Sequence, residues 1–110
     1  MGSDWKKNYL IPMTLPIQIP QPQLADFCRR NHIRKLSFFG SVIGNGFSPT
    51  SDIDVLVEFE PNHIPGFQFF SMQDELTVLL GRQVDLNTPQ FLSKYFRDKV
   101  MQEAVVAYAA

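Results

Sequence analysis

Residues 52 to 59 alternate between acidic and apolar side chains, and this pattern sets the first limit on the architecture. The apolar members are Ile53, Val55, Val57 and Phe59, and the acidic members are Asp52, Asp54 and Glu58. Side chains two positions apart in a β-strand lie on the same face of the sheet. The segment is therefore predicted to be a strand with one apolar and one acidic face, and another layer must cover the apolar face.

The rest of the chain divides into an arm and one domain. Residues 1–21 are expected to form an extended N-terminal arm, with an edge strand as the alternative, because Pro16 and Pro20 interrupt an apolar alternation and cannot donate to a β-ladder. Residues 22–110 are expected to fold as a single domain. Its predicted elements are a helix over 22–30, a strand over 33–39, a short helix after Gly40, the strand 53–59, a helix over 67–80 that ends at Gly81, a short strand over 83–86 and a long helix from Thr88 to about Tyr108. This order predicts an α/β (α+β) domain with a small sheet and helices packed on one face.

Composition excludes several classes of function. Lys and Arg total 10 and Asp and Glu total 11, a net charge of −1, which disfavours direct binding to nucleic acids through their phosphates. The single cysteine excludes an intrachain disulfide and a cysteine-based zinc cluster within one chain. No apolar run approaches the ~20 residues of a membrane span, and no secretory signal is recognisable. A soluble, cytoplasmic protein without membrane contact is expected.

The two aspartates of the predicted strand are suited to a divalent cation. Asp52 and Asp54 would have Cα atoms about 6.5 to 7 Å apart on one face of the strand. Unpaired, their charges would repel and raise each other's pKa. Mg²⁺ takes oxygen ligands and often binds one or two carboxylates together with substrate phosphates. A solvated acidic face is the simpler interpretation of an isolated Asp-x-Asp, and it stays open at this point.

Two further features extend this pattern. Gly40-Ser41 directly follows the predicted strand 33–39, where glycine permits close approach of a ligand and Ser41 can begin a short helix that favours an anion. Asp85 lies between Val84 and Leu86 in the short strand. If that strand lies beside the strand 53–59, three carboxylates meet, which is enough for two metal ions in an in-line displacement.

The combined motif resembles a known family. Gly40-Ser41 is followed after ten residues by Asp52-Ile53-Asp54, within the run SDIDVLVEFEP, and the run VDLNTP begins at Val84. This pattern is similar to that of the minimal nucleotidyltransferases (MNT) of the DNA polymerase beta-type superfamily, and it extends over residues 22 to 108. The resemblance implies a nucleotidyltransferase core with a mixed sheet and flanking helices.

The resemblance also implies an activity and a site. Family members that act as antitoxins transfer AMP from ATP to a tyrosine of a HEPN-domain ribonuclease toxin and so block it. The implied nucleotide-binding residues are Gly40, Ser41 and Ser51, and the implied catalytic and Mg²⁺-binding residues are Asp52, Asp54 and Asp85. The implied partners are therefore ATP and a HEPN toxin. A site this small also suggests a partner or a second copy that encloses the substrate, so a homo-oligomer is a further possibility.

One departure leaves an alternative open. Family members commonly carry Arg-Gly where this chain has Gly44-Asn45, so a cation that would neutralise triphosphate charge is missing. Arg34, Lys35 and Arg82 are the candidates to replace it. The alternative function is a non-catalytic antitoxin that neutralises its partner by direct binding. Modification of a small molecule or an RNA end is a third reading, which the small size of the chain disfavours.

Aromatic and histidine residues outside the motif have simpler interpretations. Phe67, Phe69 and Phe70 exceed what one helical stripe requires; core packing is the favoured interpretation and a partner surface the alternative. His32 is expected to end the first helix. His63 falls in a polar loop, with substrate contact as a minor alternative.

Overall fold

The computed structural model describes residues 15–44 and 46–110. The helices are α2 (Gln21–Arg30), α3 (Gln68–Leu80) and α4 (Arg97–Glu103), with short 3₁₀ helices η2 (Gly40–Ile43) and η3 (Pro89–Phe91). The strands are β1 (Ile33–Phe39), β2 (Ile53–Phe59), β3 (Val84–Asn87) and β4 (Val105–Ala109). None of the helices in the described ranges is long and apolar enough to cross a membrane.

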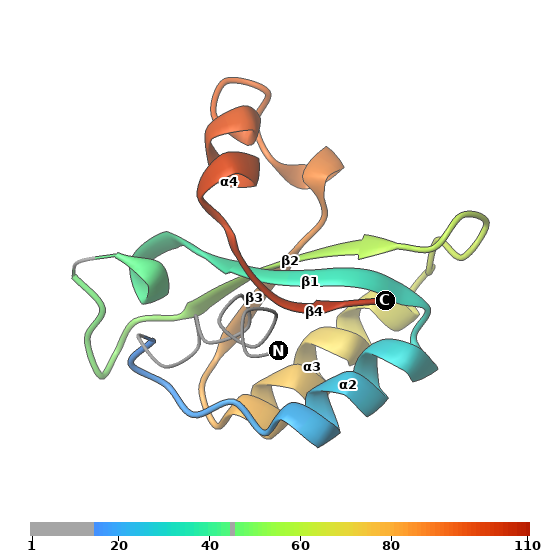
Figure 1. Ribbon diagram of the computed structural model, residues 1–110, viewed down its shortest axis with the longest axis horizontal. Coiled ribbons are helices and arrows are strands. Elements are labelled where there is room, and N and C mark those ends of the chain that lie inside the picture. Colours follow the sequence, from blue (N-terminus) through green and yellow to red (C-terminus); the bar gives the residue numbers. More distant parts are fainter. Residues whose placement is uncertain (1–14, 45) are drawn as a thin grey trace, which may run out of the picture.

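The four strands form one mixed sheet in the order β3-β2-β1-β4. β1 is antiparallel to β2 and β4, whereas β2 and β3 are parallel and are joined through α3. Parallel neighbours need such a crossover connection. Helices α2 and α3 lie side by side on one face of the sheet, while α4 lies beyond the other face (Figure 1). The predicted α/β class with a small mixed sheet is confirmed.

The core lies between the sheet and the pair α2 and α3. The buried residues of this cluster include Leu24, Phe27 and Cys28 of α2, Leu36 and Phe38 of β1, Ile53, Val55 and Val57 of β2, and Met72, Leu76 and Leu80 of α3. The apolar face of β2 is therefore buried as its alternation predicts. Burial raises the pKa of the Cys28 thiol to about 12, which fits a small core residue rather than a reactive nucleophile.

Helix α3 ends as its sequence predicts. Gly81 adopts the left-handed conformation at φ 73°, and its N–H donates to the carbonyl oxygen of Thr77 at 2.9 Å. Glycine adopts this conformation without the steric cost that a Cβ brings. The chain can therefore turn at once into Arg82 and β3, which places the short strand beside β2.

The predicted long helix from Thr88 to Tyr108 is wrong. The segment forms η3, then α4, and its last residues form β4 as the outer strand next to β1. Leu92, Phe96, Val100 and Ala104 follow a helical period, but Val105 and Val106 are β-branched and favour a strand. Leu36 and Tyr108 are partners in the β1–β4 pair. Pairing with a distant strand therefore overrides the local periodicity.

Part of the predicted arm lies against the domain. Leu15, Ile17 and Ile19 are partly buried and pack on the core cluster, with no strand pairing over 15–20. The alternating apolar residues therefore contact the body, and the prolines between them keep the segment out of the sheet. The remainder of the predicted arm, residues 1–14, lies outside the described residues.

Candidate active site

Strand register brings two of the predicted carboxylates together. Asp54 of β2 and Asp85 of β3 are direct partners in the parallel pair. Adjacent strands lie about 4.8 Å apart, so two side chains at paired positions on one face must meet. The pairing of β2 with β3 therefore places the Asp54 and Asp85 side chains next to each other.

Gly40 lies against the same carboxylate. Phe39 pairs with Asp54 at the end of β1, and the chain then turns at Gly40 with φ 76° into η2. A Cβ built on Gly40 would overlap Oδ2 of Asp54 and would lie 3.1 Å from its Cγ. A glycine is needed here for two separate reasons, the backbone conformation and the space.

The crowding of acids changes the pKa of Asp54. Burial raises the pKa of this carboxyl group, and the charges of Asp85 and Asp52 and side-chain hydrogen bonding to Asp85 raise it further. A bound cation would offset the repulsion between these carboxylates, because its positive charge would neutralise them. The all-oxygen donor set matches the preference of Mg²⁺.

We expect Asp54→Asn to stabilise the metal-free protein. Because the folded-state pKa of Asp54 is raised, ionisation costs stability: the loss sets in as the pH rises through the ordinary carboxyl range and is complete above the raised folded-state pKa. Asparagine stays neutral, so Tm at neutral pH should rise by a few degrees at most, because solvent screens the charges around this partly buried group.

Thermal unfolding in the presence of EDTA checks this expectation. The gain in Tm should shrink at acidic pH, where Asp54 is protonated in the parent protein. Asp74→Asn removes the same charge from the exposed face of α3 and should leave Tm nearly unchanged. A lower Tm for Asp54→Asn at neutral pH would contradict the assigned electrostatic cost.

Asp52 lies apart from the other two acids of the predicted set. It directly precedes β2, is exposed as Asp85 is, and its carboxylate does not complete a group with Asp54 and Asp85 in which all donor atoms lie within 4.8 Å. It is still near enough for its charge to raise the pKa of Asp54. The carboxylates thus form a pair, Asp54 and Asp85, with Asp52 close to it.

The predicted nucleotide-binding residues surround this group. Ser41 lies in η2, directly after Gly40, and is partly buried. Ser51 lies just before Asp52, and its hydroxyl accepts a hydrogen bond from the N–H of Ser48 at 3.0 Å. The Ser51 side chain thus closes the turn that leads into the acidic strand.

Arg82 holds this turn, a role that the sequence pattern did not reveal. Its guanidinium donates to the carbonyl oxygens of Ser48 and Ser51, at 2.8 and 2.5 Å, and lies 4.6 Å from the ring centre of Phe47. Charge-assisted hydrogen bonds of this kind are stronger than neutral ones. Because Asp52 comes next in the chain, Arg82 is a positioning residue for that carboxylate.

We expect Arg82→Met to lower both the stability of the protein and the rate of a reaction catalysed at this site. The substitution leaves two partly buried carbonyl oxygens without their donor, so the free energy of unfolding should fall by about 1–2 kcal/mol. Asp52 would lose its fixed position, and the rate should fall by about tenfold. Urea unfolding and initial rates check both effects.

Arg34→Met is the matched control for the loss of stability in Arg82→Met, because it removes the same charge. Arg34 forms an ion pair with Glu58 at 3.2 Å and is largely exposed. A surface pair of this kind contributes between about 0 and 1 kcal/mol. Equal losses of unfolding free energy in the two variants would show that Arg82 stabilises through charge alone and not through the turn.

The three candidate cations already have partners. Arg34 and Lys35 both face Glu58 on β2, at 3.2 and 3.9 Å, so they balance a structural acid. Arg82 is bound to backbone carbonyls. The place of the family's Arg-Gly falls at Gly44, which ends η2, and at Asn45, which lies outside the described residues. None of the three cations is therefore free in this structure to replace the missing one.

A large cleft opens beside Asp85. It has a volume of about 830 Å³ and lies between the loop after β2, the start of α3 and the segment after β3. Asp85 and Thr88 form part of its polar lining, and Phe69, Phe70 and Phe91 part of its apolar lining. Its mixed lining suits a segment that presents both an aromatic ring and polar groups.

Several aromatic side chains near the cleft are open to solvent. Phe67 is 89% exposed and Phe70 is 66% exposed, whereas Phe69 packs against the core. Core packing was therefore the wrong interpretation for Phe67 and Phe70. Beyond β3, Phe91 is 66% and Tyr95 89% exposed. Large exposed aromatics are typical of surfaces that contact a partner.

Comparison with other proteins gives this site a family. The nucleotidyltransferase domain family matches residues 22–107. The protein adenylyltransferase MntA of Thermococcus cleftensis is 34% identical over 74 residues, which cover 66% of this chain and 73% of that protein. A Methanocaldococcus jannaschii protein, named as a candidate protein adenylyltransferase, is 33% identical over 76 residues, which cover 69% of this chain and 81% of that protein.

Solved structures share the fold. A candidate minimal nucleotidyltransferase matches with a TM-score of 0.65 and 28% identity, over 77% of this chain and 86% of that one. A toxin–antitoxin structure with AMP-PNP matches with a TM-score of 0.67 and 18% identity, over 84% and 75%. The Shewanella oneidensis complex of a tri-AMPylated HEPN toxin with an MNT antitoxin matches with a TM-score of 0.58 and 17% identity, over 82% and 70%. The chain belongs to the nucleotidyltransferase domain family, and within it to the minimal nucleotidyltransferases.

Proposed function

We propose that this chain is an antitoxin that uses Mg²⁺ and ATP to transfer AMP to a tyrosine of a HEPN-domain ribonuclease toxin. The observation that carries the proposal is the packing of Gly40 against Asp54, with Asp85 paired to Asp54 across β2 and β3. The names of the adenylyltransferase relatives support the reaction, and the toxin–antitoxin structures support the partner.

Each residue of the site would have a separate role. Asp52 and Asp54 would hold Mg²⁺ with the triphosphate, and Asp85 would complete the set. Bound Mg²⁺ would supply charge neutralisation at the phosphates. The turn at Gly40 and Ser41 would receive the triphosphate close to Asp54, because the missing Cβ lets the Asp54 carboxylate pack directly against this turn. Ser51 would keep Asp52 in place through its turn with Ser48.

The chemical step is an in-line displacement. The tyrosine oxygen forms a bond to the α-phosphorus of ATP, and the bond from that phosphorus to the bridging oxygen breaks and releases pyrophosphate. Asp85 accepts the proton from the tyrosine hydroxyl, because it lies both beside Asp54 and on the wall of the cleft. Positioning and electrostatics supply most of the acceleration in such reactions.

The cleft and its aromatic rim would receive the acceptor segment. The cleft reaches Asp85, and its volume of about 830 Å³ can accept a tyrosine with its neighbours. Phe67 and Phe70 lie exposed at the start of α3, where they can pack against a partner. A protein substrate therefore fits better than a small molecule.

The same aromatic surface favours a second candidate, an antitoxin that neutralises by contact alone. The absence of a cation at Gly44 that would neutralise the triphosphate also favours the contact-only candidate. In that case a HEPN partner would bind at Phe67, Phe70 and Phe91 without being modified. The two candidates differ in whether the partner gains mass.

Mass spectrometry of the partner tests the proposal. The chain is incubated with Mg²⁺, ATP and a HEPN-domain protein from the same organism, and the intact HEPN protein is then weighed. We expect a gain of one or more adenylate masses, mapped to tyrosine by fragmentation. An unmodified partner in a complex that still binds ATP would favour the contact-only candidate.

A further inference from the structure

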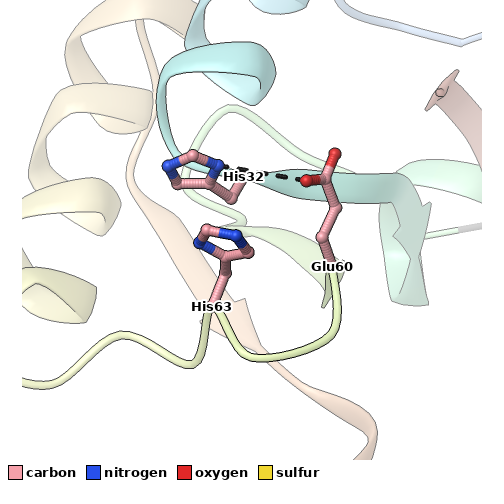
Figure 2. A group of neighbouring side chains, drawn as sticks. All are labelled: His32, Glu60 and His63. Atoms are coloured by element: carbon pink, nitrogen blue, oxygen red, sulfur yellow. Dashed lines mark ion pairs between the residues drawn. The ribbon is translucent and has the colours of Figure 1, made fainter.

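Two histidines and a glutamate gather at the far end of the β1–β2 pair from Asp54 (Figure 2). His32 precedes β1, Glu60 follows β2, and His63 comes three residues later. Asp54 and Glu60 are six residue steps apart along the strand, about 20 Å. One donor atom from each side chain lies within 4.8 Å of the others. We propose that His32, Glu60 and His63 form a binding site for Zn²⁺ or a similar late first-row divalent cation, separate from the aspartate site.

The backbone holds these three donors together before any metal binds. Glu60 N–H donates to the carbonyl oxygen of His32 at 2.9 Å, and His63 N–H donates to that of Glu60 at 3.1 Å. His32 and Asn62 adopt left-handed φ values of 56° and 66°, which non-glycine residues adopt rarely. The site is therefore built by two tight turns tied by hydrogen bonds, and only side-chain torsions remain to adjust.

The side chains already face one another. The two imidazole rings are stacked with centroids 3.9 Å apart, and Nδ1 of His32 lies 3.9 Å from Oε1 of Glu60 (Figure 2). A tetrahedral Zn²⁺ with bonds of about 2.0–2.1 Å places its ligands about 3.4 Å apart. The nitrogen lone pairs of the stacked rings lie in nearly parallel planes, so the rings must turn out of the stack to share one ion. Both rings are exposed and χ2 of histidine is broad, which permits this rotation.

The donor types decide which metal fits. Two imidazole nitrogens and one carboxylate oxygen form a set that Zn²⁺ accepts, with water as a fourth ligand. Mg²⁺ instead requires near-octahedral oxygen ligands. The histidine–glutamate site and the aspartate site would therefore select different cations from the same solution.

The surrounding charges do not oppose a cation. Glu60 brings a negative charge into the group. Arg30 lines the same small cavity, of about 390 Å³, as both histidines, but Asp26 and Glu75 bind its guanidinium at 2.8 and 2.6 Å. Its positive charge is thus compensated, and the cavity gives water access to the metal.

A bound cation would also act on the large cleft. The loop of residues 61–66 carries His63 and lines both the small cavity and the cleft beside Asp85. Coordination would tie this loop to the α2–β1 turn at His32. The outer wall of the cleft would then be fixed.

The two histidines of the chain provide a direct measurement, since no other histidine contributes signals. We titrate the untagged full chain with Zn²⁺ in excess Mg²⁺ and follow the ring nitrogens by ¹H–¹⁵N correlation. Both rings should respond together and saturate at one equivalent. A response of one ring only, no response at stoichiometric Zn²⁺, or loss of the response in Asp52→Asn/Asp54→Asn would overturn the proposal.

Substitutions then identify the ligands. Glu60→Gln should weaken Zn²⁺ binding by about tenfold or more, as measured by competition with a chromophoric chelator. Glu58→Gln, a neighbouring acid that pairs with Arg34 and Lys35, should leave the affinity unchanged. His32→Asn removes the imidazole ligand, and asparagine tolerates the left-handed φ of this position. The variant should therefore lose Zn²⁺ binding with little change in the Tm of the metal-free protein. Retained affinity in Glu60→Gln and His32→Asn would refute the site.

Discussion

Replacing Asp52 and Asp54 together with asparagine is expected to reduce adenylyl transfer to the partner by about a thousandfold or more. Removing a single preorganised charge-stabilising group typically costs 10²–10³ in rate, and this double variant removes two of the three carboxylates. The partner should gain no detectable adenylate mass in a reaction that is complete for the parent protein. The free variant should nevertheless be folded, because the change relieves repulsion around Asp54.

The control for this double variant removes the same charge elsewhere. Asp74 and Glu103 are exposed on α3 and α4, and Asp74→Asn/Glu103→Gln should keep full activity. Suppression of toxicity in cells separates the two candidate functions. If the aspartate variant folds, binds the HEPN partner and still suppresses its toxicity, the chain neutralises by contact and the enzymatic proposal fails.

Gly40→Ala should destroy activity while it costs only modest stability. Alanine at φ 76° carries a penalty of about 1–2 kcal/mol, and its methyl group would overlap the Asp54 carboxylate. The carboxylate is a movable side chain, so it would be displaced rather than the backbone. Because a misplacement of about 1 Å can cost 10²-fold in rate, we expect transfer to fall by about a hundredfold or more.

Gly81→Ala is a closely matched control for this change. Gly81 has nearly the same conformation, φ 73°, but an added Cβ there meets nothing within 4 Å. Both alanine variants should therefore lose similar stability in urea unfolding, whereas only Gly40→Ala should lose activity. An equal loss of activity in the two variants would mean that backbone strain, and not contact with Asp54, makes Gly40 necessary.

The fold of the central part follows from local patterns. The alternation over residues 53–59 and the glycine at position 81 identify β2 and the end of α3, because both patterns report on which side chains become buried. The sequence predicts that Asp85 lies beside Asp54 only if the short strand is a neighbour of the strand 53–59. Strand order depends on the crossover through α3, which no local period encodes.

The C-terminal segment shows the limit of such patterns. An apolar stripe from Leu92 to Ala104 has the spacing of a helix, yet the chain stops α4 at Glu103 and joins β1 through Val105 and Val106. The stabilisation comes from a strand some 70 residues earlier in the chain. A window of neighbouring residues carries no information about that partner.

The histidine–glutamate cluster was missed for a similar reason. His32 and His63 lie in two separate turns, and each has an ordinary interpretation when it is considered alone. Only the antiparallel pairing of β1 with β2 brings the turns together, since Ile33 and Phe59 are partners at that end of the sheet. Arg82 was considered only as a phosphate-neutralising cation, and its role in the turn gave no signal, because its acceptors are backbone carbonyls, which every sequence contains.

The crowded acids at Asp54 also bear on how long the protein survives in a cell. When the site is empty, its carboxylates repel one another, so local unfolding is more frequent in the empty protein than in the ligand-bound one. Proteases cleave the locally unfolded form. Any ligand that binds only the folded chain lowers the opened fraction in proportion to its occupancy. The turnover of this small protein would therefore follow the supply of any ligand that occupies this site, without any dedicated sensor.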